Sequence, residues 1–310
     1  MDQSLYRYAD IGLIHFMAYP QCIRGEGPIL ETLKEIADDP FFTAVEITWI
    51  KDPVVRKEAR ALLRQAGLKV AYGAQPPLLT QKLSLCSLDA AGRRAAVDQI
   101  KACIDEAYEI GAAGLAVLSG PVPDDPARYA EATDRLVDSL AELCAHSAAQ
   151  GAMPVVLETF DQVPYGKNAL SGPTKDAVAI SERVRARHPS FGLMLDLSHL
   201  PLLGETASDM LGTARDHVAH VHIGNCVMRD PGHPAYGDEH PRFGIEGGEV
   251  GVPELAVFLQ ELRRIGYLDP ARRRIVSFEV KPVAAFGEAS SVVVANAKRA
   301  LQQAWAMVRG

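Results

Sequence analysis

Short apolar runs and amphipathic stretches alternate along the whole chain. The runs are six or seven residues long and predict about eight strands, at 11–16, 43–49, 68–73, 113–118, 154–159, 191–197, 218–223 and 274–280. Because each run is apolar almost throughout, it suits a parallel strand covered on both faces. The stretches between them have helical spacing and predict helices at 29–37, 54–67, 90–112, 127–151, 175–188, 207–217, 252–266 and 290–308.

Strand and helix alternation repeated about eight times predicts an α/β fold, a single (β/α)8 TIM barrel domain over residues 1–310. The alternative is a doubly wound open sheet, but no GxGxxG phosphate loop follows the first strand. Two connections are longer than such units normally need, 75–89 and 224–251. We expect the second, rich in Asp, His, Arg, Pro and Gly, to form a long loop over the active site.

Composition narrows the class of protein. The chain is 48% apolar and 23% charged, as in ordinary globular proteins. A net charge of -7 without a Lys/Arg cluster disfavours a nucleic-acid partner. The start of the chain lacks the apolar core of a signal peptide, and no apolar run is long enough to cross a membrane, so we expect a cytoplasmic protein. The five cysteines form no close pair and are expected to be reduced.

Four metal-binding side chains stand where predicted strands give way to loops: Glu158, Asp196, His222 and Glu279. Taken singly, each glutamate could cap a helix or pair with an arginine, Asp196 could cap a turn, and a histidine could simply be packed. Together they end the fifth to eighth strands, which are adjacent in a barrel and meet at its C-terminal face. The four residues therefore predict one divalent-metal site. His220, two residues before His222, points to the same side but lies deeper.

The donor set indicates the kind of metal. Three carboxylates and one imidazole make a hard, oxygen-rich site, which favours Mn²⁺ and also suits Mg²⁺ or Co²⁺. Structural zinc would call for thiolates or several histidines.

These residues resemble the xylose isomerase-like barrels, and within them the metal-dependent ketose 3-epimerases, hydroxypyruvate isomerases and inosose dehydratases. The resemblance covers nearly the whole chain in strand order and is most specific at Glu158, DLSH at 196–199, HVHIGN at 220–225, GIEGGEVGVPEL at 244–255 and Glu279. It implies that Glu158, Asp196, His222 and Glu279 bind the metal and that His199 contacts substrate oxygens. The epimerases also have an arginine a few residues after the metal-binding histidine. Here the sixth residue after His222 is Met228, and the arginine, Arg229, comes one residue later.

A metal that chelates a carbonyl and a neighbouring hydroxyl oxygen acidifies the adjacent carbon and stabilises an enediolate. Glu158 and Glu279 could then serve as base and acid on its two faces. Proton return to the opposite face gives epimerisation, and return to the next carbon gives isomerisation. Loss of a hydroxyl or carboxyl group from the same intermediate gives a lyase reaction instead.

The predicted function is therefore a metal-dependent sugar or sugar-acid isomerase/epimerase, with a dehydratase or decarboxylase on an oxidised sugar or inosose as the alternative. An abasic-site nuclease would need more metal ligands and a basic groove, and a non-catalytic barrel would not need the ligand set. The expected partner is a small carbohydrate. Because no glycine-rich phosphate loop is evident, a non-phosphorylated substrate is favoured, and the sequence is compatible with a homo-oligomer. The predicted substrate contacts are His199, Arg229, Arg242, His15 and Glu46.

Overall fold

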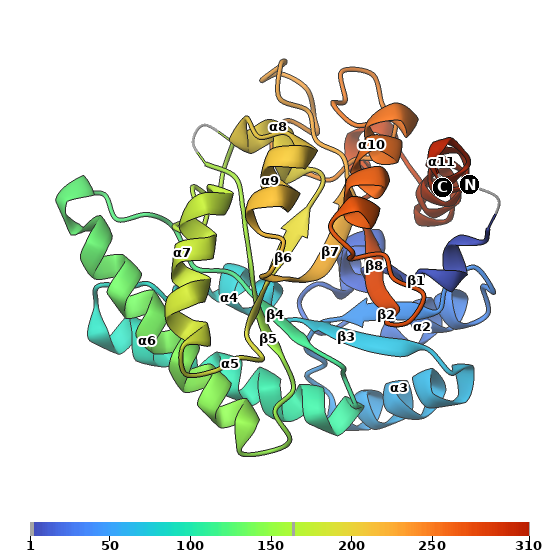
Figure 1. Cartoon of the computed structure of the whole chain (residues 1–310). Helices are drawn as coiled ribbons and strands as arrows, with labels where there is room; N and C mark the ends of the chain where they lie inside the picture. Colours follow the sequence, from blue (N-terminus) through green and yellow to red (C-terminus); the bar gives the residue numbers. More distant parts are fainter. Residues whose placement is uncertain (1–2, 163–164, 310) are drawn as a thin grey trace.

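The structure, a computed structural model, describes residues 3–162 and 165–309 and contains one eight-stranded parallel sheet (Figure 1). The strands run in the order β1-β8-β7-β6-β5-β4-β3-β2. The backbone N–H of Thr43 donates to the Ile11 carbonyl over 2.9 Å, and a bridge joins Ile14 to Glu46, so β1 and β2 also meet. The predicted TIM barrel is thus confirmed. The strand bounds are β1 Ala9–Leu13, β2 Ala44–Ile47, β3 Lys69–Gly73, β4 Leu115–Val117, β5 Val155–Glu158, β6 Gly192–Asp196, β7 Val218–Gly224 and β8 Arg274–Glu279.

Helices surround the strands (Figure 1). Local signals fix several ends: the Asp52 carboxylate accepts from the Val54 N–H over 2.7 Å where α3 begins, and Gly67 ends it with φ +69°. The α-helix bounds are α1 His15–Ala18, α2 Ile29–Ala37, α3 Pro53–Ala66, α4 Gln75–Gln81, α5 Ala90–Ile110, α6 Tyr129–Ala148, α7 Thr174–Arg185, α8 His199–Leu203, α9 Ala207–Thr213, α10 Val252–Arg264 and α11 Ser290–Met307.

Alternate strand residues face two different environments. In β5, Val155 and Leu157 belong to the main core between strands and helices, whereas Val156 belongs to a small separate cluster with Ala116 and Met194. Since strand side chains alternate with period two, Glu158 follows Val156 into the barrel lumen. The same rule applies in β2, where Glu46 follows Ala44. Polar side chains near the ends of these strands therefore point at the barrel axis.

Two sequence predictions need correction. The segment 75–89, expected to be a long loop, begins with helix α4, because Pro76 and Pro77 suit a first helical turn, where no N–H is needed. The first strand was predicted at 11–16 but spans Ala9–Leu13, and His15 opens the short helix α1.

The segment 224–251 is a loop as predicted, without helix or ladder strand after Gly224 until α10 begins at Val252. Its own apolar cluster of Val227, Ala235 and Ile245, packed with Val283, gives it a fixed shape. All five cysteines are free and buried, as expected of reduced thiols. In residues 3–162 and 165–309, the structure has no helix with the length and apolar character of a membrane span.

Candidate metal centre

The four predicted ligands converge at the C-terminal end of the barrel. Glu158, Asp196 and Glu279 are the last residues of β5, β6 and β8, and His222 lies two residues before the end of β7. One ligand atom from each of the four lies within 4.8 Å of the others, and all four side chains are buried. The shared position follows from the parallel topology, which brings the ends of neighbouring strands to one face.

His222 joins the carboxylates to one another. Its Nδ1 lies 2.8 Å from Glu279 Oε2 and 3.7 Å from Glu158 Oε1, while its Nε2 lies 3.1 Å from both oxygens of Glu46. Burial alone would lower the pKa of His222, but the surrounding carboxylates, Glu46 foremost, raise it well above its ordinary value. With Nε2 directed at Glu46, Nδ1 is the nitrogen that faces the carboxylate cluster, and Glu46 fixes the orientation of the ring.

Asp196 and Glu158 have opposite surroundings. Both oxygens of Asp196 accept hydrogen bonds from Ser198, from its N–H over 2.8 Å and from its hydroxyl over 2.6 Å. Glu158 Oε2 accepts from Gln75 Nε2 over 2.7 Å, whereas Glu158 Oε1 is buried without a hydrogen-bond partner among the described residues. Such an atom is costly unless a cation or proton satisfies it.

Charge also favours a cation at this position. Burial raises the pKa of Asp196, and the nearby carboxylate of Glu279 raises it further. A divalent ion would relieve this repulsion and would use the open oxygen of Glu158. The residues present therefore fit a divalent metal.

A second group of polar side chains lies beside the first. Asp238 Oδ1 is 3.0 Å from His199 Nε2 and 2.8 Å from His240 Nε2, and its other oxygen pairs with Lys167. Burial opposes charge on His199, but Asp238 raises the pKa of this histidine to about 10. His240 Nδ1 is 3.5 Å from Asp196 Oδ2, so the group adjoins the metal ligands. Asp196, His199 and His240 also have ligand atoms within 4.8 Å of one another, a spacing that a second cation could use.

Only some of the predicted substrate contacts lie beside the four predicted ligands. Glu46 and His199 lie against the ligand cluster, the latter held by the Thr159 carbonyl 2.6 Å from its Nδ1. His15 is buried with its Nε2 2.7 Å from Thr32 Oγ1. Arg229 and Arg242 form ion pairs away from the ligand cluster.

Arg229 and Arg242 each form an ion pair within or beside the 224–251 loop. Arg229 Nη2 lies 2.6 Å from Glu249 and its side chain is 81% exposed. Arg242 Nε lies 2.8 Å from Glu288 Oε1. In this structure neither guanidinium has a partner among the four predicted ligands.

Gln75 and Lys167 lie at the site but are not among the residues predicted from the sequence. Gln75 comes two residues after the end of β3, so the strand-end rule that singled out the four ligands also applies to it. Lys167 lies in the connection between β5 and α7, where no periodic pattern shows which side chain turns inward. The pair Asp238 and His240 was seen only as part of a polar loop.

Comparison with known proteins identifies the family to which the chain belongs. The model of the xylose isomerase-like TIM barrel family matches residues 34–296. No match is found among curated protein sequences.

Several solved structures share the fold at low sequence identity. The IOLI protein with a bound zinc atom has a TM-score of 0.74 at 15% identity, covering 97% of this chain and 99% of that one. D-psicose 3-epimerase with D-tagatose from Clostridium cellulolyticum H10 has a TM-score of 0.70 at 17% identity, covering 97% and 100%. The 3-keto-D-glucoside 4-epimerase YcjR from E. coli has a TM-score of 0.65 at 18% identity, covering 96% and 99%.

Proposed function

The chain belongs to the xylose isomerase-like TIM barrel family, and from this premise we propose that it is a divalent-metal-dependent isomerase or epimerase of a sugar or sugar acid. The observation that supports this most is the convergence of Glu158, Asp196, His222 and Glu279, with ligand atoms within 4.8 Å of one another. The epimerases of similar fold act on keto sugars, as their names state, which supports a sugar as the substrate class.

We assign the metal site to these four residues and propose Mn²⁺ as the ion, with Mg²⁺ or Co²⁺ as alternatives, since three of the four ligands offer oxygen. When bound, a divalent ion draws electron density from a carbonyl oxygen and so favours loss of a proton from the neighbouring carbon.

Glu158 and Glu279 are proposed as the acid and base. They end β5 and β8, with β6 and β7 between them, so they can address a bound carbon from different sides. Glu158 Oε2 accepts from Gln75 Nε2 over 2.7 Å, which fixes the side chain. Glu279 is held by His222 Nδ1 at 2.8 Å from Oε2 and by His240 Nε2 at 3.3 Å from Oε1. Removal on one face and return on the other gives epimerisation.

The surrounding residues would position the substrate and keep out water. His199, fixed by Thr159 and Asp238, is proposed to contact substrate oxygens. The 224–251 loop places His240 beside Glu279 and is proposed to keep water from the site, which would protect a reactive carbanion from side reactions.

The decisive experiment is deuterium exchange. Candidate ketoses and keto acids are incubated in D₂O with protein and Mn²⁺, the ion is removed on a chelating resin, and ¹H NMR is recorded. We expect deuterium at the carbon beside the carbonyl together with a new epimer or aldose. Loss of water or CO₂ would support the lyase alternative instead. Exchange that is equal with and without Mn²⁺, or absent for every substrate class, would refute the proposal.

A binding measurement tests the site separately. Asp196→Asn removes a metal ligand and should weaken Mn²⁺ binding, whereas Glu58→Gln, an exposed residue of α3, should leave it unchanged. Elemental analysis gives the number of ions per chain, and we expect one, because the other two candidate groups each share a ligand, His222 or Asp196, with the first. A second ion would point to Asp196, His199 and His240 or to Glu46, His220 and His222.

A further inference from the structure

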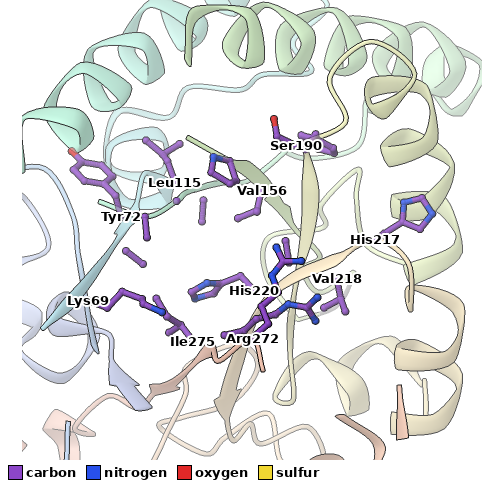
Figure 2. Close-up of a pocket in the computed structure, with 18 of the residues that line it drawn as sticks. Lys69, Tyr72, Leu115, Val156, Ser190, His217, Val218, His220, Arg272 and Ile275 are labelled. Carbon is purple, nitrogen blue, oxygen red and sulfur yellow. The ribbon is translucent and has the colours of Figure 1, made fainter. Parts of the chain in front are cut away.

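A cavity of about 500 Å³ opens at the other end of the barrel, where the strands begin (Figure 2). Its lining includes Lys69, Val218 and Arg274, each the first residue of its strand. The candidate metal centre lies at the opposite ends of the same strands. The cavity is therefore distinct from the site described above and shares with it only Glu46, at its inner end.

The cavity exists because the lumen is underfilled near the strand beginnings. Barrel interiors are usually packed with layers of bulky branched side chains. Here Ala44, Ala71 and Ala116 occupy lumen positions, and Ala71 and Ala116 line the cavity directly. Val156 and Ile275 are the larger lumen side chains around it (Figure 2).

A polar pair forms its inner limit. His220 Nε2 lies 2.6 Å from Glu46 Oε1, and both residues line the cavity. Glu46 in turn contacts His222 on the metal side. This layer separates the two spaces, so a molecule in the cavity would meet His220 and not the metal ligands. Figure 2 shows His220 and Lys69 directed into the space between the strands.

The lining has a marked excess of positive charge. Asp216 is exposed at the cavity rim and Glu46 is already paired with two histidines. Against these two carboxylates stand five cationic side chains, Lys69, Arg185, Arg272, Arg273 and Arg274. The whole chain has a net charge of -7, so this concentration of cations runs against the overall balance. It also corrects the expectation of no Lys/Arg cluster, because Arg272, Arg273 and Arg274 are consecutive and gather here with Lys69 and Arg185.

Some of this charge is already neutralised. Lys69 and Arg273 share Asp10, the guanidinium of Arg273 lying 3.4 Å from its carboxylate. Arg185 donates to the backbone carbonyl of Asp216, and Arg274 stacks 5.0 Å from the Tyr267 ring centroid. Among residues 3–162 and 165–309, neither of these two guanidinium groups forms an ion pair with a carboxylate. Arginine forks match phosphate oxygens in geometry as well as charge.

We propose that this cavity binds a small phosphorylated molecule, with its phosphate held by the arginines at the mouth and its uncharged part in the alanine-lined lumen. The volume lies within the range of small-molecule sites. The alternative is that these cations are simply exposed to solvent at the end of the barrel. That alternative does not account for the empty lumen or for the pair of His220 and Glu46 at its inner end. The ligand would be distinct from the substrate of the metal centre.

The test is binding of inorganic phosphate, measured by isothermal titration calorimetry on the metal-loaded protein at constant ionic strength, with acetate as a carboxylate comparison that does not strip the metal. Arg272→Glu reverses an exposed charge in the lining and should weaken phosphate binding about tenfold or more without unfolding the chain. Arg60→Glu, the same change at an exposed position of α3 outside the lining, should change it less than twofold.

A tungstate-soaked crystal locates the anion by anomalous scattering, and we expect the signal between Arg272 and Arg274. The proposal would be overturned by equal losses in both variants or by no phosphate binding at millimolar concentration. Tighter binding of acetate than of phosphate, or tungstate found only at the metal centre, would overturn it as well. None of these measurements requires turnover, so the result is independent of the proposed reaction.

Discussion

The contact between Glu46 and His222 offers the sharpest test of how the barrel would support the proposed metal site. The Glu46 carboxylate accepts from His220 Nε2 at 2.6 Å and lies with both oxygens 3.1 Å from His222 Nε2. Burial alone would raise the pKa of Glu46, but the two histidines hold it well below its ordinary value, so Glu46 is an anion at neutral pH. Glu46→Gln keeps the shape and removes the charge.

The size of the effect of Glu46→Gln on Mn²⁺ affinity follows from the number of hydrogen-bond acceptors at this side chain. Glutamine offers one acceptor oxygen where glutamate offers two, so its NH₂ group must face one of the two imidazoles. Loss of a hydrogen bond to an ionised group costs about 1.5–3 kcal/mol, and loss of the carboxylate behind a metal-binding histidine typically costs about 10–100-fold in affinity or activity. We therefore expect Mn²⁺ affinity to fall about 10–100-fold, or about 1.4–2.8 kcal/mol.

Mn²⁺ affinity is measured by competition with a chelating dye at pH 7, with Glu58→Gln as the matched control on the exposed face of α3. A thermal melt of each variant checks that the barrel is folded. If Glu46→Gln binds Mn²⁺ as tightly as the wild type, then the His222 ring is held by its other contacts and the reasoning is wrong.

Three further predictions address catalysis, the loop and stability. Glu158→Gln and Glu279→Gln should keep measurable Mn²⁺ binding yet lose turnover by about a hundredfold or more at saturating metal, and near wild-type turnover in either would refute its role as acid or base. The substrate role of Arg229 and Arg242 stays a prediction: a fall in kcat/KM on change to Ala at unchanged metal affinity would support it, and wild-type values would leave both arginines to their surface ion pairs. Burial lowers the pKa of His15 to about 3, so the unfolded chain, in which it titrates near 6.5, binds the extra proton, and the contribution of His15 to stability falls as pH drops below about 6.5. Between pH 7 and pH 5 this contribution should fall by about 2 kcal/mol, measured by urea unfolding as the difference in pH dependence between the wild type and His15→Gln, whereas equal pH dependence would show that His15 is protonated in the folded protein.

Local patterns were sufficient for most elements and for bringing the four predicted ligands to one end of the barrel. The helix predicted at 29–37 coincides with α2, and Glu158, Asp196 and Glu279 end strands as expected. These features depend on residues close in sequence, on periodicity and on the chemistry of a strand end. Short apolar segments were less reliable, since the prolines of 75–81 open a helix where a loop was expected.

Contacts across the lumen could not be predicted in the same way. His220 and Glu46 are 174 residues apart, and their hydrogen bond depends on how β2 and β7 face each other across the barrel. The 224–251 loop presents the same difficulty, because without periodicity nothing in its sequence distinguishes the inward Asp238 and His240 from the outward Arg229. A charged side chain in a loop is only a candidate until the loop's own packing is known.

One strand pattern accounts for both ends of the barrel. Because lumen residues recur every second position, the side chain that precedes a polar residue by two also faces the axis. Ala44 lies beneath Glu46 and Val156 beneath Glu158, so the polar groups near the strand ends stand above small or medium apolar ones. A bulky residue at Ala116 or Ala71 would fill the lower cavity, and at Ala71 it would lie beside Glu46, its register neighbour on β2. The small lumen residues therefore leave both the space of the lower cavity and the room around Glu46, and the proposed phosphorylated ligand would occupy the first of these.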